Sequence, residues 1–228
     1  MTALFIAGAH TDVGKTHVAC ALIRAARARD LAVDAFKPVV SGFDAADWTD
    51  SDPGRLLAAL GRPLSPEALA AISPWRFAAP LAPPMAAKLE ARALPLGPIV
   101  EAARTWLAAS PADLRLVEGV GGLMSPMADG ATGLDLMRAL GLPAVLVGGS
   151  YLGAISHTLT ALEVLRAQGL PVTALAVSEA ADPDAPDFAA TVASVAEHAH
   201  GLPVLAAPRT SDVAWADRLL TAFGAGSR

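Results

Sequence analysis

The feature that most constrains this chain is a glycine-containing turn between its first apolar run and its first helical segment. Leu4–Ala7 is continuously apolar, and it leads directly into Gly8-Ala9-His10-Thr11-Asp12-Val13-Gly14-Lys15-Thr16. A segment with helical spacing, His17–Arg29, follows. A strand, a turn ending in Gly-Lys-Thr and a helix form the context in which backbone N–H groups and a helix N-terminus bind phosphate. The turn therefore predicts a nucleotide-phosphate loop within an α/β fold.

Roles within this turn follow from residue type. Lys15 is predicted to reach the β- and γ-phosphates, and the Thr16 hydroxyl is predicted to bind Mg²⁺. The first glycine lies one position earlier than in the standard loop, at Gly8 instead of Ala9. The residues that we expect to contact the nucleotide here are Gly8, Asp12, Val13, Gly14, Lys15, Thr16 and His17.

Apolar runs and helical segments alternate along the rest of the chain. The further runs are Leu31–Phe36, Leu114–Val117, Ala144–Val147, Val172–Val177 and Val204–Ala206, and the further helical segments are Pro98–Ala109, Leu134–Leu140, Ala154–Gln168 and Asp187–His200. Most runs are continuously apolar, as strands buried on both faces are. The pattern predicts a P-loop NTPase-like, doubly wound, mostly parallel sheet with helices on both faces. Ser41–Pro84, rich in Pro, Gly and Asp, is interpreted as a long functional loop with short helices.

Composition limits the class of protein. The 228 residues are 54% hydrophobic and 17% charged, with 17 basic and 22 acidic residues and a net charge of −5. A net acidic chain without a basic run is a poor partner for nucleic acid or an anionic membrane. The one cysteine, Cys20, excludes an intramolecular disulfide, and no apolar run reaches the roughly 18 residues that a bilayer requires. We expect a soluble cytoplasmic protein of one domain, residues 1–228, with a flexible tail at about 224–228.

A second motif follows the second apolar run. It reads Lys37-Pro38-Val39-Val40-Ser41-Gly42, and Lys37 is one of three lysines, with Lys15 and Lys88, in a chain that otherwise uses arginine. A lysine at the carboxyl edge of the sheet, beside the phosphate loop, can neutralise a transferring phosphoryl group or a substrate oxyanion. The alternative is a solvated lysine at a strand end. The adjacent Ser-Gly and the scarcity of lysine favour the functional interpretation.

A third motif, Glu118-Gly119-Val120-Gly121-Gly122, follows the run Leu114–Val117. A carboxylate leaving a central strand is suited to holding a metal ion beside bound phosphates. Asp52 is a second metal candidate, although Asp44, Asp47 and Asp50 share its loop and much of this acidity is expected to be solvated surface. The predicted metal ligands are therefore Thr16, Asp52 and Glu118.

Other patterns carry no chemistry. Gly148-Gly149-Ser150-Tyr151-Leu152 lacks the second glycine of a nucleophile elbow. Glu197, His198 and His200 lack the His-x-x-x-His spacing of a zinc site. Cys20 lies among alanines and is expected to be a small buried hydrophobe.

Together these motifs resemble the dethiobiotin synthetase family, the ATP-dependent carboxylases of biotin synthesis. The resemblance covers Leu4 to about Arg209 and rests on the phosphate loop, Lys37–Gly42, Glu118–Gly122 and Leu152-Gly153-Ala154-Ile155-Ser156-His157. Pro74-Trp75-Arg76-Phe77 and Pro80–Pro84 are similar to the family's Pro-aromatic and Pro-rich substrate loop.

The resemblance implies a reaction. An amino group of 7,8-diaminononanoate takes up CO₂ as a carbamate, a carbamate oxygen attacks the γ-phosphate of MgATP, and the second amine closes a urea ring with release of phosphate. It further implies a homodimer that binds neither nucleic acid nor membrane. The catalytic residues would be Lys37, Lys15 and Thr11, the substrate residues Thr11, Lys37, Ser41, Gly121, Ala154, Ile155 and Ser156, and the nucleotide residues would include Glu118, Ser178 and Pro208.

The chain departs from the family pattern at informative positions. Ala9, His10 and Asp12 replace the family's Thr, Asp and Glu in the loop. Ser156 replaces an Asn that helps to hold the substrate carboxylate from the neighbouring subunit, and Ser178 replaces an Asn that reads adenine.

Two other functions compete with this interpretation. An amidoligase of the cobyrinic-acid amidase type needs a glutaminase domain with a nucleophilic cysteine, which the chain does not supply. A deviant-loop switch ATPase of the partitioning or septum-positioning kind carries a signature lysine four residues before the second loop glycine, where this chain has His10. Phosphate release that depends on DNA, membrane or glutamine would favour these alternatives.

Overall fold

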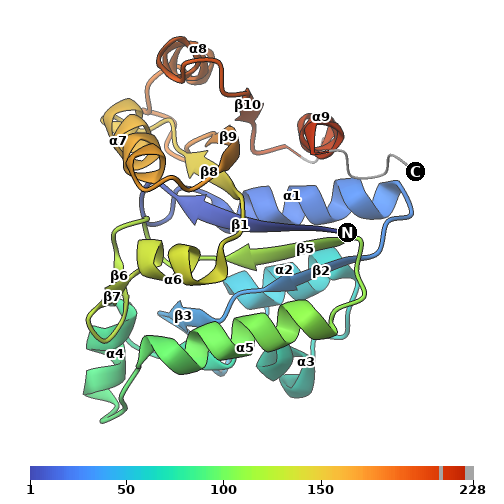
Figure 1. Ribbon diagram of the computed structural model, residues 1–228, viewed down its shortest axis with the longest axis vertical. Coiled ribbons are helices and arrows are strands. Elements are labelled where there is room, and N and C mark those ends of the chain that lie inside the picture. The colour runs from blue at the N-terminus through green and yellow to red at the C-terminus, as the bar shows by residue number, and fades with distance from the viewer. Residues whose placement is uncertain (211–212, 224–228) are drawn as a thin grey trace.

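The computed structural model describes residues 1–210 and 213–223, so the predicted tail at 224–228 lies outside the described residues. Its centre is a six-stranded parallel sheet in the order β10-β9-β8-β1-β5-β2 (Figure 1). The strands are β1 (Thr2–Gly8), β2 (Val33–Phe36), β5 (Leu114–Glu118), β8 (Ala144–Gly148), β9 (Val172–Ser178) and β10 (Val204–Ala207). Each predicted apolar run forms one of these strands, which confirms the doubly wound fold class.

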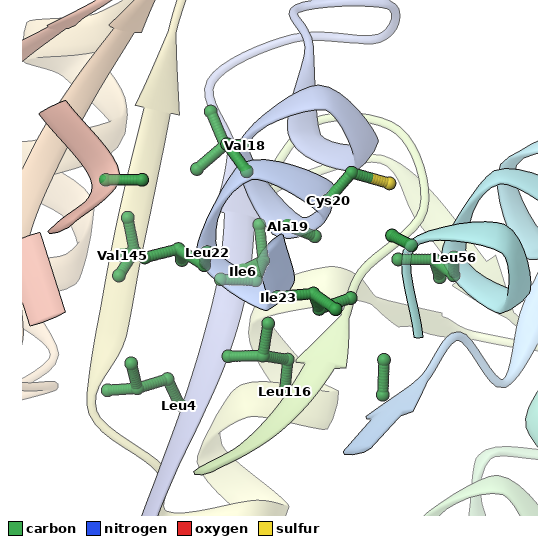
Figure 2. Packing of buried hydrophobic residues seen from close by; sticks show 14 of the residues in the cluster. Leu4, Ile6, Val18, Ala19, Cys20, Leu22, Ile23, Leu56, Leu116 and Val145 are labelled. Atoms are coloured by element: carbon green, nitrogen blue, oxygen red, sulfur yellow. The ribbon is translucent and has the colours of Figure 1, made fainter. Parts of the chain in front are cut away.

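Helices cover both faces of the sheet. One face carries α1 (Lys15–Ala28), α2 (Asp52–Leu60), α3 (Pro66–Ile72) and α9 (Ala214–Ala222), and the other carries α4 (Pro83–Leu89), α5 (Leu96–Ala109), α6 (Gly133–Leu140), α7 (Ala154–Ala167) and α8 (Phe188–His198). Alternate residues of β1 pack into the cores on the two faces of the sheet, because successive side chains of a strand point in opposite directions. Leu4 and Ile6 pack in the cluster under α1, whereas Phe5 and Ala7 pack in the other cluster. Figure 2 shows Leu22 and Ile23 of α1 over Ile6.

Two predicted boundaries change at the ends of α1. The helix begins at Lys15, two residues before the predicted start, because the phosphate loop passes directly into its first turn and Val18 N–H donates to Gly14 O (3.0 Å). The strand predicted from Leu31 begins at Val33. Asp30 has a positive φ of 57°, and Leu31 N–H donates to Ala26 O (3.1 Å), so Leu31 belongs to the turn that ends the helix.

The sequence does not predict the short strands outside the main sheet. Within the segment interpreted as a loop, β3 (Val39–Ser41) pairs in parallel with β4 (Trp75–Phe77), and α2 and α3 account for the short helices expected there. β6 (Pro126–Ala128) and β7 (Ala131–Thr132) form an antiparallel hairpin. The β3–β4 pair fixes the chain that follows Lys37, and Ser41 lies in register with Phe77.

The strand order places the three motifs at one edge. β1 is flanked by β8 and β5, and β5 is flanked by β1 and β2. The phosphate loop, Lys37 and Glu118 therefore leave the carboxyl ends of neighbouring parallel strands, where open α/β sheets bind ligands. Within residues 1–210 and 213–223, no helix is long and apolar enough to cross a membrane.

Candidate nucleotide and substrate site

The phosphate loop needs glycine at Gly14. This residue has a φ of 98°, and a Cβ there would collide with the hydroxyl of Ser178 at the end of β9. Asp12 also has a positive φ, 56°, which Asp tolerates better than most residues. The loop therefore closes tightly over the N-terminus of α1, the geometry that presents backbone N–H groups to an anion.

Lys15 lies buried against the loop that precedes it. Its Nζ donates to His10 O at 3.4 Å, a long and weak contact. Burial, together with the positive charge of Lys37, lowers the pKa of Lys15 to about 8. A phosphate anion at this position would stabilise the charged ammonium.

A buried ion cluster joins three elements beside the loop. Lys37 Nζ donates to Glu118 Oε1 (2.5 Å) and lies 2.7 Å from Asp52 Oδ2. The hydroxyl of Thr16 donates to the same Glu118 oxygen (2.6 Å). Lys37 is 1% and Glu118 2% exposed, whereas the Asp52 side chain is 42% exposed. The cluster thus connects the sheet edge to the nucleotide loop and to the start of α2.

The opposite charges of Lys37 and Asp52 favour the ionised form of each. Burial lowers the pKa of Lys37, but Glu118 and Asp52 outweigh burial and hold it above the ordinary lysine value. Burial likewise raises the pKa of Asp52, and the Lys37 ammonium outweighs it, so this pKa is below the ordinary value. Lys37 is therefore a permanent positive charge near neutral pH.

The same cluster suits a magnesium ion. Glu118 Oε2 is buried and has no hydrogen-bond partner among the described residues, and Asp52 and the Thr16 hydroxyl supply further oxygen atoms. In the described part of the chain, no group of three or more His, Cys, Asp or Glu gathers into a metal cage. Two carboxylates and a hydroxyl beside substrate phosphates are the donors that Mg²⁺ prefers.

Two adjoining clefts open beside the cluster. The nucleotide cleft, about 210 Å³, is lined by Asp12, Gly14, Lys15, Thr16, His17, Asp52, Arg55 and Arg209. The second cleft, about 460 Å³, is called the substrate cleft after its expected ligand and is lined by Thr11, Asp12, Ser41, Pro80, Leu81, Ala82, Pro83, Val120, Gly121, Ser125 and Pro126. Asp12 lines both, so the phosphate loop forms the boundary between them.

Most of the expected site residues gather here. Thr11, Ser41 and Gly121 line the substrate cleft together with the Pro-rich segment. Gly8 lies directly beside the side chain of Lys15, and a Cβ on Gly8 would come within 2.9 Å of Lys15 Cδ. Val13 is buried in the core under the loop.

The residues predicted to bind the base form a separate group. His17 Nε2 lies 3.0 Å from Pro208 O, so its N–H donates to that carbonyl, and burial lowers the pKa of His17. Ser178 is 1% exposed, and its hydroxyl has no partner among the described residues. It lies under Gly14 and does not line the nucleotide cleft, so a contact between Ser178 and a base stays a prediction.

The predicted carboxylate-binding turn lies apart from these clefts. Ala154, Ile155 and Ser156 open α7 after Gly153, and none of them lines either cleft. The turn is nevertheless connected to the phosphate loop, because the His10 ring stacks on His157 with centroids 5.3 Å apart.

The sequence analysis does not identify two of the polar lining residues, Arg55 and Ser125. Arg55 belongs to no motif, although it follows Asp52 by three positions on α2 and so shares a helix face with it. The hydroxyl of Ser125 accepts from Gly122 N–H (2.9 Å) and orders the glycine turn after β5.

The fold and the loop define the class of protein, the P-loop NTPase fold class. Over 96% of the chain, the fold matches MinD in the MinC:MinD cell division complex of Aquifex aeolicus (TM-score 0.54, 10% identity, 86% of that chain). It also matches, over 96% of the chain, a ParA family ATPase of Chlorobium tepidum (TM-score 0.51, 13% identity, 92% of that chain). A family model for the AAA domain matches residues 2–216.

Sequence relatives identify the family more narrowly. The ATP-dependent dethiobiotin synthetase of Phenylobacterium zucineum is 56% identical over 100% of this chain and 97% of its own length. Two further relatives carry the same name. That of Caulobacter vibrioides is 56% identical over 93% of this chain and 94% of its own length, and that of Methylobacterium nodulans is 50% identical over 92% of this chain and 94% of its own length. The chain belongs to the ATP-dependent dethiobiotin synthetase family. The resemblance predicted from the motifs is confirmed, and the switch ATPases share only the fold.

Proposed function

We propose that this chain is the ligase that converts 7,8-diaminononanoate, CO₂ and ATP into dethiobiotin, ADP and phosphate. The observation that carries the proposal is the position of Lys37. This buried cation contacts Asp52 of the nucleotide cleft, and four residues later the same segment supplies Ser41 to the substrate cleft. Lys37 lines neither cleft, but a fixed positive charge joined to Asp52 of one cleft and four residues from Ser41 of the other fits the transfer of a phosphoryl group between two ligands.

The phosphate loop performs the first part of the reaction. Its backbone and the start of α1 bind the phosphates, and Lys15 neutralises the charge of the β- and γ-phosphates. Mg²⁺ is part of the proposal, with Thr16, Asp52 and Glu118 as its protein ligands. When bound, it would neutralise charge on the nucleotide phosphates.

The substrate cleft performs the second part. One amine of the substrate adds to CO₂ and loses a proton, which gives a carbamate anion. Thr11, Ser41 and Gly121 line the cleft in which we place it, and Lys37 supplies the cationic charge nearby. A carbamate oxygen then displaces ADP from the γ-phosphorus, which forms a carbamic–phosphoric anhydride.

Ring closure completes the reaction. The second amine attacks the carbonyl carbon of the anhydride, and the carbon–oxygen bond to phosphate breaks. Phosphate leaves with the carbamate oxygen, and the amine proton is lost to solvent. Holding both amines beside one carbon converts this step into an intramolecular reaction with a large effective concentration.

A homodimer is a further part of the proposal. Ala154–Ser156 open a 14-residue helix. Ala154 N–H already donates to Tyr151 O (2.9 Å), which leaves the N–H groups of Ile155 and Ser156 to bind a carboxylate, yet these residues line neither cleft of their own chain. Leu152 beside them is 89% exposed, as a residue that packs against a second copy would be in an isolated chain. We also place the enzyme in the cytoplasm, because it consumes ATP.

A coupled phosphate-release assay tests the proposal. Phosphate release from ATP should require both the diamine and bicarbonate, and dethiobiotin should appear in equal amount. Release that is independent of the diamine, or that depends on DNA, membrane vesicles or glutamine, would contradict it. Analytical ultracentrifugation tests the dimer, since an active monomer at assay concentration would overturn that part alone.

A further inference from the structure

Arg55 occupies an unusual position at the mouth of the nucleotide cleft. It lies in the first turn of α2, three residues after Asp52, so the two side chains share one face of the helix. Asp52 is fixed by Lys37 (2.7 Å), and both Asp52 and Arg55 line the nucleotide cleft with Lys15 and Thr16.

The backbone that carries Arg55 is held firmly. Leu56 and Leu57 are fully buried in the core beside α1, and Figure 2 shows Leu56 opposite Cys20. The Cys20 thiol donates to Arg55 O (3.5 Å), and Arg55 N–H donates to Ser51 O (2.9 Å). The guanidinium therefore leaves a rigid turn at the edge of the cleft.

The guanidinium itself has no hydrogen-bond or ion-pair partner among residues 1–210 and 213–223. The other arginine that lines the cleft, Arg209, is already engaged, because its Nε donates to Glu179 O (2.7 Å). Of the two acidic groups in the lining, Asp52 is paired with Lys37, and Asp12 acts through its charge on Lys15, whose pKa it raises. The exposed guanidinium of Arg55 is thus the cationic group of this lining that stays available for a ligand, as far as the described residues show.

We propose that Arg55 binds the phosphate chain of the nucleotide and acts as a second cationic phosphate ligand beside Lys15. A guanidinium offers several donors in a planar fork that matches phosphate oxygens, and such charge-assisted bonds are stronger than neutral ones. Arg55 approaches from α2, whereas Lys15 approaches from α1, so the two cations hold the phosphates from different elements. The inference rests on the proposed use of ATP.

Nucleotide binding by three variants tests this role. Calorimetry with MgADP should show at least about tenfold weaker binding for Arg55→Ala, the size of one charge-assisted contact. Arg55→Lys should recover part of the loss, because it keeps the charge without the fork. The KM for ATP should rise in parallel with the dissociation constant. Adenosine, which has no phosphate, should bind the wild type and Arg55→Ala equally.

Arg24→Ala is the matched control. Arg24 lies on α1 and lines neither cleft. Its charge acts on the same group as that of Arg55, because both oppose the rise that burial causes in the pKa of the Cys20 thiol. Arg24→Ala changes the net charge by the same amount as Arg55→Ala and at a nearby position. Because solvent screens the charge of Arg24, the ADP affinity of Arg24→Ala should stay within about twofold of wild type.

The outcomes separate this inference from the proposed function. Equal ADP affinity in Arg55→Ala and wild type, or an equal loss in Arg24→Ala, overturns the role of Arg55 even if the wild type makes dethiobiotin. A specific loss of ADP affinity in Arg55→Ala supports the role even if phosphate release does not require the diamine. An unchanged unfolding midpoint in Arg55→Ala supports a direct contact between Arg55 and the ligand. A lowered midpoint, together with a loss of adenosine affinity as large as the loss of ADP affinity, overturns that contact.

Discussion

Replacing Glu118 with glutamine removes one negative charge from the buried ion cluster and keeps the size of the side chain. In the structure, Glu118 Oε1 accepts from Lys37 Nζ (2.5 Å) and from the Thr16 hydroxyl (2.6 Å). The ammonium of Lys37 is almost completely buried. After the substitution it keeps only one anionic partner, Asp52 at 2.7 Å.

The expected loss of stability follows from this burial. Removing one partner of a buried ion pair costs about 3–5 kcal/mol, because the other charge stays in a medium of low polarity. Asp52 remains as a partner but is 42% exposed, so its carboxylate compensates only in part. We expect Glu118→Gln to lose about 3 kcal/mol, which lowers the melting temperature of a chain of this size by about 6–12 °C.

A double-mutant cycle in urea measures the coupling. Lys37→Met removes the ammonium, so Glu118→Gln combined with Lys37→Met should recover about 2 kcal/mol relative to the sum of the single effects. The raised pKa of Lys37 determines the pH at which the cycle is measured. A lysine whose pKa is raised in the folded state stabilises the fold at any pH below its ordinary pKa, and this stabilisation is lost as the pH rises through the pKa of the folded state. The cycle is therefore measured at pH 8, where the stabilisation by Lys37 is fully present. Additive effects within about 0.5 kcal/mol would refute the coupling.

Other variants test individual roles in the site. Lys15→Ala should lower kcat by about 100-fold or more, since its charge acts on the transferring phosphate, and near wild-type turnover would contradict this. At pH 8, ADP binding should take up about half a proton, because phosphate raises the pKa of Lys15 from about 8; equal enthalpies in buffers of different ionisation enthalpy would contradict it. Lys37→Arg should be inactive, since a planar fork cannot replace a compact buried ammonium, and full activity would reduce Lys37 to a general cation. Ser178 offers one hydroxyl where the family has an amide, and losing a bidentate contact to the base costs about 5- to 150-fold in discrimination. By kcat/KM, ATP should therefore be preferred over CTP or GTP less strictly than in relatives with Asn, and a preference beyond about 1,000-fold would contradict this.

The central sheet could be predicted because its strands are buried on both faces. A run such as Leu4–Ala7 is apolar throughout, and this continuity distinguishes it from a half-exposed strand. β3 and β4 have three residues each, too few to show a period. The helix α4 begins with Pro83 and Pro84, which resemble a loop in sequence although proline suits the first turn of a helix.

The candidate site could be predicted only where one segment carries a whole motif. The phosphate loop is contiguous, so its residues could be assigned directly. The contact between Lys37 and Glu118 joins positions 81 apart, and it depends on β2 and β5 being neighbours in the sheet. Arg55 belongs to no motif, and its role depends on how α2 packs on α1.

Isotope transfer tests the central claim most directly. With ¹⁸O-labelled bicarbonate, ATP and the diamine, mixed faster than the label exchanges with water, the account predicts one ¹⁸O atom in the released phosphate. It also predicts an equal amount of dethiobiotin, because the carbamate oxygen that attacks the γ-phosphorus leaves with phosphate at ring closure. Dethiobiotin formed with unlabelled phosphate would contradict the anhydride, and phosphate released without dethiobiotin would contradict the proposed function itself.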